Sequence, residues 1–254
     1  MMALGITAVS AAETVFEQTP VDRGVTAYKQ GDYRKARRWL STEDVANNPK
    51  AWYYLGLMYQ EGVGGFEVDK ARALRLFQQS ADQGVPEAML QIADLYARGA
   101  GVPANLAMAR IWHERAANSG SVEGMYLCAQ DFSSPSSELP PDYDRARKWY
   151  EQAASLGHAE AMRSLGDLYR NGQGVDASMV DALMWYRLAV KAGSVQANVG
   201  EAFLMKILPA DKRAMADKLA QEWEVLVGRA PAPVPTEGAS AAPSATGTST
   251  TPAP

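Results

Sequence analysis

The chain has 254 residues, of which 47% are hydrophobic, and 25 Lys and Arg against 29 Asp and Glu give it a net charge of −4. This length suits one large domain or two small ones. No run reaches the ~18–20 apolar residues that a membrane-spanning helix needs, and the negative charge provides no general footprint for nucleic acid. A single cysteine and two histidines exclude an internal disulfide framework and a thiolate metal cluster, so we expect no metal and no cofactor.

The first twelve residues are typical of the end of a secretory signal peptide. They are apolar through Val9, and Val-Ser-Ala at 9–11 has the small-x-small pattern that signal peptidase recognises. We therefore expect residues 1–12 to be the remnant of a signal peptide that begins upstream of Met1, and the protein to be periplasmic or secreted. A cytoplasmic protein with a frayed end is the alternative. Mass spectrometry of the native N-terminus distinguishes the two, because an intact Met1 contradicts export.

A repeat of 36 or 37 residues organises the chain after this segment, with units that start at Ala51, Ala88, Gly124, Ala161 and Ala197. The first half of each of the first four units carries an apolar residue and, four positions later, an aromatic one, which together form one face of an α-helix. Three of these halves end in a glycine, at the position of a left-handed C-cap. The pairs are Leu55 and Tyr59, Ile92 and Tyr96, Cys128 and Phe132, and Leu165 and Tyr169.

The second half of each unit predicts another amphipathic helix. It carries an alanine, a large residue three positions later, and an alanine or valine five positions after that. Each of these segments closes on a glycine, namely Gly84, Gly120, Gly157 or Gly193. One such helix pair cannot bury its apolar face alone, but stacked pairs can. The sequence therefore predicts an all-α, right-handed α-solenoid of stacked helix–turn–helix repeats.

The repeat register also predicts the domain boundaries. In the third unit SSPSSELPP at 133–141 replaces the glycine turn, which predicts a longer hairpin, and near the end Pro209 starts a helix while Trp223 is available to seal the last interface. The Pro-, Ala- and Thr-rich tail at 227–254 has too few apolar residues to offset its ordering entropy, so we expect it to be disordered. We expect a helical repeat domain at 13–226, with a cap at 23–50, repeats at 51–87, 88–123, 124–160 and 161–196, and closing helices at 197–226.

The repeated residues resemble a known family. The pattern A-x-x-x-L-G-x-x-Y-x-x-G-x-G-V, followed by A-x-x-W-Y-x-x-A-A-x-x-G, is similar to the bacterial Sel-one-like repeats, which are tetratricopeptide-like, and GDYRKA at 31–36 resembles their N-terminal unit. The resemblance covers residues 23–226 and implies a scaffold that binds other proteins along its concave face, frequently in the bacterial envelope. One subgroup, associated with penicillin binding and β-lactam hydrolysis, has a cysteine pair in each repeat. This chain lacks such pairs, so that activity does not transfer.

The positions of the histidines, the cysteine and the glycine clusters within the repeat favour a structural role for each over a chemical one. His113 stands at an aromatic packing position, and His158 follows Gly157 in a loop where the Pro-Cys-x-x-Cys partner of a deaminase is missing. Cys128 replaces a core leucine, which predicts a buried, inert thiol. A catalytic or ligand role for these residues is the alternative. The glycine clusters follow helices and lack the Lys-Ser/Thr of a phosphate loop, so they are turns. The basic residues of the cap helix are a solvated face or, alternatively, a docking site, and they are Arg34, Lys35, Arg37 and Arg38.

A partner would bind along the first helix of each unit, because in such solenoids this helix lines the inner side of the curve. Residues outside the packed face would form a groove that is aromatic and apolar near Tyr53 and Leu57 and charged near Arg163 and Asp167. The apolar end would supply binding energy, and the charged end would fix direction. The expected groove residues are Tyr53, Leu57, Gln60, Leu90, Asp94, Tyr126, Gln130, Arg163, Asp167 and Arg170.

These observations predict a non-catalytic scaffold or adaptor of the bacterial cell envelope, monomeric, with a partner polypeptide in its groove. An immunity-type inhibitor that blocks a toxin fits the same residues. A cell-wall-active enzyme is the competing class, although no carboxylate pair is marked by a hydrophobic pocket or a fixed nucleophile. Turnover of peptidoglycan or of a chromogenic β-lactam that is lost in Asp94→Ala or Asp167→Ala would favour the enzyme.

Overall fold

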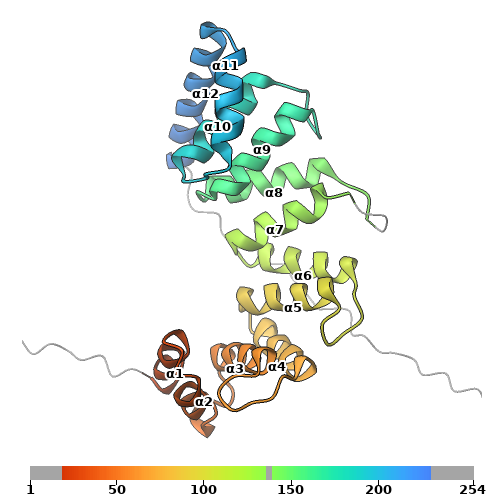
Figure 1. Cartoon of the computed structure of the whole chain (residues 1–254), viewed down its shortest axis with the longest axis vertical. Coiled ribbons are helices and arrows are strands. Elements are labelled where there is room, and N and C mark those ends of the chain that lie inside the picture. The colour runs from red at the N-terminus through yellow and green to blue at the C-terminus, as the bar shows by residue number, and fades with distance from the viewer. Residues whose placement is uncertain (1–18, 136–138, 230–254) are drawn as a thin grey trace, which may run out of the picture. The chain divides into compact units, whose positions relative to one another are not determined.

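The computed structural model describes residues 19–135 and 139–229, which form α-helices and one short 3-10 helix and contain no strand (Figure 1). The all-α repeat fold predicted from the sequence is confirmed over these residues. The predicted signal peptide at 1–12 lies outside them, and so does most of the predicted tail at 227–254. Residues 227–229 of that tail are instead the last residues of α12. The helices are α1 (Pro20–Lys29), α2 (Tyr33–Leu40), η1 (Glu43–Val45), α3 (Pro49–Glu61), α4 (Lys70–Asp82), α5 (Pro86–Arg98), α6 (Leu106–Asn118), α7 (Val122–Ser133), α8 (Tyr143–Ser155), α9 (Ala159–Asn171), α10 (Met179–Lys191), α11 (Ala197–Ile207) and α12 (Ala210–Arg229).

The chain divides into two compact units, residues 1–76 and 77–254. In unit 1, helices α1, α2 and α3 pack on one another around a core that includes Val25, Leu40 and Met58. Polar side chains start each of these helices, because Thr19, Asp32 and Asn48 accept hydrogen bonds from backbone N–H groups of the first turn. The helices of unit 1 are therefore specified locally as well as by their shared core.

In unit 2 each predicted helix pair forms as expected, α5 with α6, α7 with α8, and α9 with α10, and successive pairs stack on one another (Figure 1). The core runs through these pairs and includes the fully buried side chains Phe132, Leu165, Leu183 and Leu204. None of the helices in the described ranges has the length and apolar character needed to cross a bilayer.

The predicted glycine C-caps are present at α3, α5 and α9. Gly62, Gly99 and Gly172 have φ values of 69°, 66° and 65°, and each donates its N–H to a carbonyl of the last helical turn. The third unit differs, because α7 ends before Ser134, which is extended, and α8 starts at its N-cap Asp142. The predicted longer hairpin includes residues 136–138, which lie outside the described residues.

The closing helices pack on α10, the last helix of the fourth repeat. The rings of Trp223 and Trp185 meet edge to face with their centroids 5.1 Å apart, which confirms the predicted sealing contact. Tyr186 is 1% exposed and lies against two glycines, because a Cβ added to Gly166 or to Gly200 would lie 2.6 Å from its ring. These small residues allow α9 and α11 to approach the tyrosine from two sides.

Candidate partner-binding site

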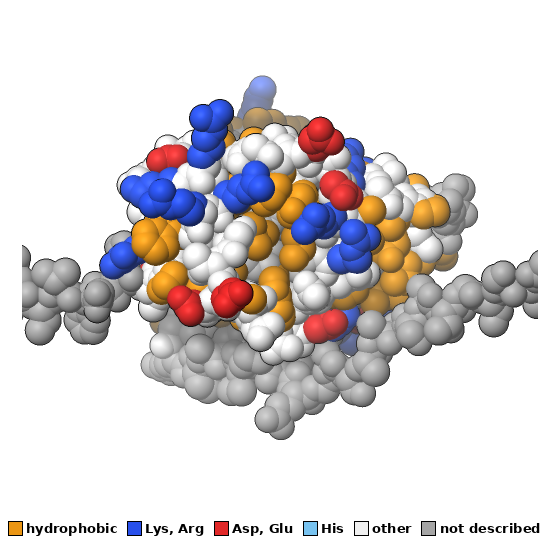
Figure 2. Space-filling view, turned by 90° about the horizontal axis from the view of Figure 1, so that it is seen from below, with side chains coloured by type: hydrophobic (Ala, Val, Ile, Leu, Met, Phe, Trp, Pro, Cys, Tyr) orange, Lys and Arg blue, Asp and Glu red, His pale blue; other side chains and the backbone are white. Residues whose placement is uncertain are grey.

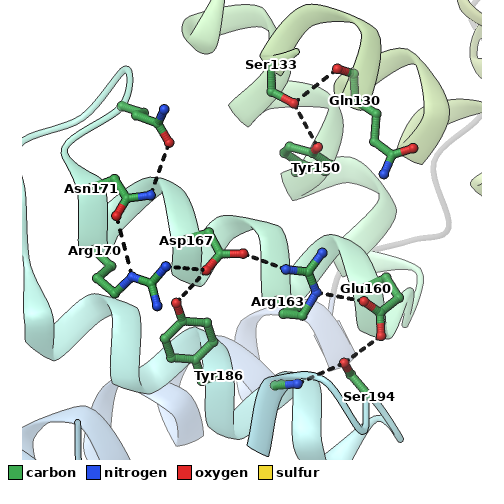
Figure 3. A network of polar contacts seen from close by, with 12 residues as sticks. Gln130, Ser133, Tyr150, Glu160, Arg163, Asp167, Arg170, Asn171, Tyr186 and Ser194 are labelled. Carbon is green, nitrogen blue, oxygen red and sulfur yellow. Dashed lines mark hydrogen bonds and ion pairs between the residues drawn. The ribbon is translucent and has the colours of Figure 1, made fainter. Parts of the chain in front are cut away.

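A row of four charged side chains runs along α9 (Figure 3). Glu160, Arg163, Asp167 and Arg170 are three or four residues apart, so they share one helix face. The Arg163 guanidinium contacts Glu160 Oε2 at 2.7 Å and Asp167 Oδ2 at 2.5 Å. Arg170 Nη2 lies 3.2 Å from Asp167 Oδ1. The four residues, named here the α9 charge row, thus alternate in sign and are bonded in sequence.

The α9 charge row is fixed from behind by residues that follow it in the chain. The Tyr186 hydroxyl on α10 donates to Asp167 Oδ1 at 2.7 Å. Ser194, just after α10, donates to Glu160 Oε1 at 2.5 Å and accepts from the N–H of Ala197 (Figure 3). Because Tyr186 and Ser194 are themselves buried, both carboxylates of the row are held by the folded core rather than by the surface alone.

The surroundings keep the row charged. Burial by itself raises the pKa of Glu160, but the hydrogen bonds from Ser194 and Arg163 outweigh it and leave the pKa below its ordinary value. Burial by itself lowers the pKa of Arg163, and the bond to Glu160 together with the charge of Asp167 outweighs it and raises the pKa. Both residues are therefore ionised near neutral pH.

Helix α7 brings an aromatic ring to this row. The ring of Tyr126 stacks on His158, the N-cap residue of α9, with centroids 4.5 Å apart, and its hydroxyl accepts from Gln130 Nε2 at 2.8 Å. Burial raises the pKa of Tyr126, while the nearby Arg163 acts in the opposite direction. The structure thus brings together five of the predicted groove residues, which we name the α7–α9 face: Tyr126, Gln130, Arg163, Asp167 and Arg170.

The other predicted groove residues are on the first helices of the two preceding repeats, α3 and α5. Tyr53, Leu57 and Gln60 are half-buried on α3 in unit 1, where Tyr53 meets the ring of Tyr54 edge to face. Leu90 and Asp94 are on α5, and Asp94 forms an ion pair with Arg98 of its own helix at 2.7 Å. Within residues 19–135 and 139–229, no hydrogen bond or ion pair links Leu90 or Asp94 to the α7–α9 face.

The residues considered for chemistry have structural contacts. His113 Nδ1 lies 2.6 Å from Asp131 Oδ2 across α6 and α7, and His158 Nδ1 accepts the N–H of Ala161. Cys128 is fully buried, and burial raises the pKa of its thiol. In the part of the chain that the structure describes, no three His, Cys, Asp or Glu side chains are grouped to hold a metal ion.

Three residues of the site were missed by the sequence reasoning. Glu160 precedes Arg163 by three positions, and this helical spacing could have identified it. Tyr186 and Ser194 reach α9 from α10 and from the turn after it, 19 and 34 residues away from their partners in the chain. No local pattern predicts such contacts, because they depend on how two helices pack.

Comparison with known proteins places these helices in a repeat family. The family model described as Sel1 repeat matches residues 23–42, 49–85, 86–121, 122–158 and 159–194. A crystal structure of a Sel1 repeat protein from Oxalobacter formigenes superposes with a TM-score of 0.66 at 25% identity, covering 78% of this chain and 83% of that one.

Two curated relatives share parts of this sequence. HRD3A of Arabidopsis thaliana, an ERAD-associated E3 ubiquitin-protein ligase component, is 33% identical over 100 residues, which are 37% of this chain and 15% of that protein. Chitin synthase regulatory factor 3 of Schizosaccharomyces pombe is 29% identical over 184 residues, which are 70% of this chain and 20% of that protein. The chain thus matches only a fifth or less of the length of these relatives.

Proposed function

Because the chain belongs to the Sel1-repeat family, whose members are generally non-catalytic protein-interaction scaffolds, we propose that it is an adaptor of the bacterial cell envelope that binds a partner polypeptide on the α7–α9 face. The observation that supports this proposal is that hydrogen bonds and ion pairs within the chain already hold the side chains of that face in position. Its side chains are half-exposed, and each charged residue of the row already has a partner that sets its position. A face that is ordered before binding loses less conformational entropy when a partner arrives.

The chemistry of the α7–α9 face favours a polypeptide over a small molecule. Tyr126 offers a ring beside its hydroxyl, and Arg163 and Arg170 offer planar guanidiniums along one helix. Tyrosine and arginine are enriched among residues that dominate binding energy at protein interfaces. Asp167 lies between the two arginines, so a partner segment with charges of both signs would match this row better than a purely acidic one.

The names of the curated relatives agree with an adaptor role. One is named as a component of a ubiquitin ligase and the other as a regulatory factor of chitin synthase, so both names describe action alongside another protein. By analogy, this chain would act through a partner rather than on a substrate of its own.

The envelope location depends on the predicted signal peptide, and it has its own test. We expect the native protein to fractionate with a periplasmic marker enzyme and to begin near Ala11 or Ala12, as the Val-Ser-Ala sequence at 9–11 predicts. A native protein that retains Met1 and fractionates with the cytoplasm would contradict the location while leaving the adaptor role in place.

Site-specific photocrosslinking in cells tests the binding face. A photoreactive amino acid at Gln130, on α7, is expected to crosslink one defined partner, and the same amino acid at the exposed Gln152, on α8, is the matched control. Adding Arg170→Ala to the Gln130 position should reduce the yield, because this guanidinium ends the α9 charge row. Equal crosslinking from both positions, or a yield that Arg170→Ala leaves unchanged, would show that the partner does not use this face.

The α3 residues of the predicted groove form a second, separate part of the proposal. Tyr53 and Leu57 are half-buried on one helix, and their replacement by Ala should weaken binding of the crosslinked partner by about 1–3 kcal/mol, the scale of interface anchor residues. The circular-dichroism melt of the variant should match that of the parent chain. Unchanged affinity with an unchanged melt would remove α3 from the site.

A further inference from the structure

Unit 1 contains a cavity of about 430 Å³ that carries positive charge and apolar walls. Two arginines, a tryptophan, three leucines and three side chains with a hydroxyl group are among its lining residues, and no Asp or Glu is. The volume is within the range of about 300–1,000 Å³ that is typical of ligand pockets. The lining residues are Arg37, Leu40, Ser41, Thr42, Ala46, Trp52, Leu55, Tyr59, Phe66, Arg72 and Leu76.

The two arginines are placed by a stack of aromatic rings. Phe66 and Tyr59 stack with centroids 4.0 Å apart. The guanidinium carbon of Arg37 lies 4.2 Å from the ring centre of Phe66, and that of Arg72 lies 4.4 Å from the ring centre of Tyr59. The order along the stack is therefore guanidinium, ring, ring, guanidinium. Such contacts orient the two cations without neutralising them.

Neither guanidinium is in an ion pair with a described residue. Arg37 Nη1 donates to the carbonyls of Gly65, at 3.0 Å, and Gly64, at 3.4 Å, which are neutral acceptors. Trp52 is fixed by a 2.7 Å bond from its indole N–H to the carbonyl of Ala46. Helix α2 adds further exposed basic residues beside Arg37. Figure 2, seen from below the view of Figure 1, shows Lys and Arg side chains, together with several Asp and Glu, interspersed with hydrophobic surface.

We propose that this cavity binds an acidic peptide segment in which a bulky apolar side chain lies next to a carboxylate. Separate carboxylates of the segment would accept hydrogen bonds from Arg37 and from Arg72, because the two stacked rings hold the guanidiniums apart, and the apolar side chain would pack between Trp52 and the leucines. Guanidinium–carboxylate bonds are strong because both groups are charged. The site shares no residue with the α7–α9 face, so it does not rest on the function proposed above.

The apolar side chains that line the cavity favour a peptide over a free anion as the ligand. Inorganic phosphate would use the guanidiniums and hydroxyls but would leave Leu40, Leu55 and Leu76 without a contact. A nucleic acid would gain little from them and would face a chain of net charge −4. A peptide that joins a carboxylate to an apolar side chain uses both kinds of wall.

The test is a titration of the full chain with two synthetic peptides. One is a blocked hexapeptide of alternating phenylalanine and glutamate, and the other has glutamine in place of glutamate. Binding is followed by the indole N–H signal of Trp52 in ¹⁵N NMR spectra, assigned with Trp52→Phe. We expect the acidic peptide to shift this signal and to bind at least roughly tenfold more tightly than its glutamine counterpart.

Arg72→Gln should weaken binding of the acidic peptide by roughly tenfold, whereas Arg75→Gln should not. Arg75 is exposed on the same helix and does not line the cavity, so it controls for general electrostatic attraction. Equal losses in the two variants, equal binding of the two peptides, or a Trp52 signal that responds equally to inorganic phosphate would each overturn the proposal. Circular-dichroism melts of both variants establish that they are folded.

Discussion

The arginines of α9 and those of the unit 1 cavity have the same charge and opposite surroundings. Arg163 and Arg170 each contact a carboxylate of their own helix, whereas Arg37 and Arg72 contact ring faces and, for Arg37, backbone carbonyls. On α9 the charges neutralise one another and order a surface. In unit 1 the positive charge is oriented but not neutralised. An arginine-rich surface is thus characterised by what the guanidiniums already contact, not by how many there are.

The largest expected effect tests the packing that holds α9, and with it the ordered charges of that helix, against α10. Gly166→Ala places a Cβ 2.6 Å from the ring of Tyr186. The ring has little room to retreat, because it packs so tightly on Gly200 that a Cβ there would also lie 2.6 Å from it. We expect unit 2 to lose about 2–3 kcal/mol of stability in urea unfolding, the cost of overpacking a filled core. Gly228→Ala on α12 is the control, since its Cβ would meet nothing within 4 Å. A similar loss in both variants would indicate a helix effect unrelated to Tyr186.

The next effect compares two aspartates that were predicted to line one groove. Asp167→Asn removes the charge that Arg163, Arg170 and the Tyr186 hydroxyl share, so we expect a loss of about 1–2 kcal/mol. Asp94→Asn breaks one exposed pair with Arg98 and should cost about 0.5 kcal/mol or less. Urea midpoints of the two variants make the comparison. Equal losses would mean that the α9 charge row has no cooperative character.

A smaller effect tests the aromatic stack of unit 1. Arg37→Ala removes the contact with Phe66 and the bonds to the carbonyls of Gly64 and Gly65. We expect a loss of about 1 kcal/mol, and Arg38→Ala, at an exposed neighbour on the same helix, should change stability by less than about 0.5 kcal/mol. If both variants melt like the parent chain, the guanidinium of Arg37 is not held by the stack.

The smallest effect is a dependence on pH. The pKa of Glu160 is lowered in the folded chain from an ordinary value of 4.5, so its stabilising contribution is complete above pH 4.5 and is lost as the pH falls through the lowered value. Urea unfolding between pH 6 and pH 3 should therefore show a shallower decline for Glu160→Gln than for the parent chain. An identical decline would mean that Ser194 and Arg163 do not favour the ionised form.

The helices and their ends could be predicted because their causes are local. The recurrence of Gly62, Gly99 and Gly172 indicates a left-handed backbone conformation at the end of a helix, which glycine adopts most readily. The spacing of apolar residues indicates the buried face of each helix. The same reasoning selected Arg163, Asp167 and Arg170 of α9 for a groove that also includes Asp94 of α5, and that groove stays a prediction. The contact between Tyr186 and Asp167 depends on how α10 packs against α9, and the repeat pattern does not predict it.

The aromatic stack of unit 1 could not be predicted from the sequence, for a related reason. Phe66 lies between α3 and α4, outside the periodic segments, and its partners Arg37 and Tyr59 come from two different helices. Periodicity assigns Tyr59 to a packed face, where it does contact other side chains. It cannot indicate that a loop residue stacks on this ring or that two cations flank the pair.

Cys128 makes the protein convenient for spectroscopic labelling. It is the chain's only cysteine and is fully buried, and its raised pKa keeps the thiol from forming the thiolate that maleimides and methanethiosulfonates attack. Cysteines introduced at the exposed positions of Arg75 and Gln152 can therefore carry nitroxide labels while the native residue stays in place. Pulsed electron paramagnetic resonance on that pair then measures the separation between the two units in solution.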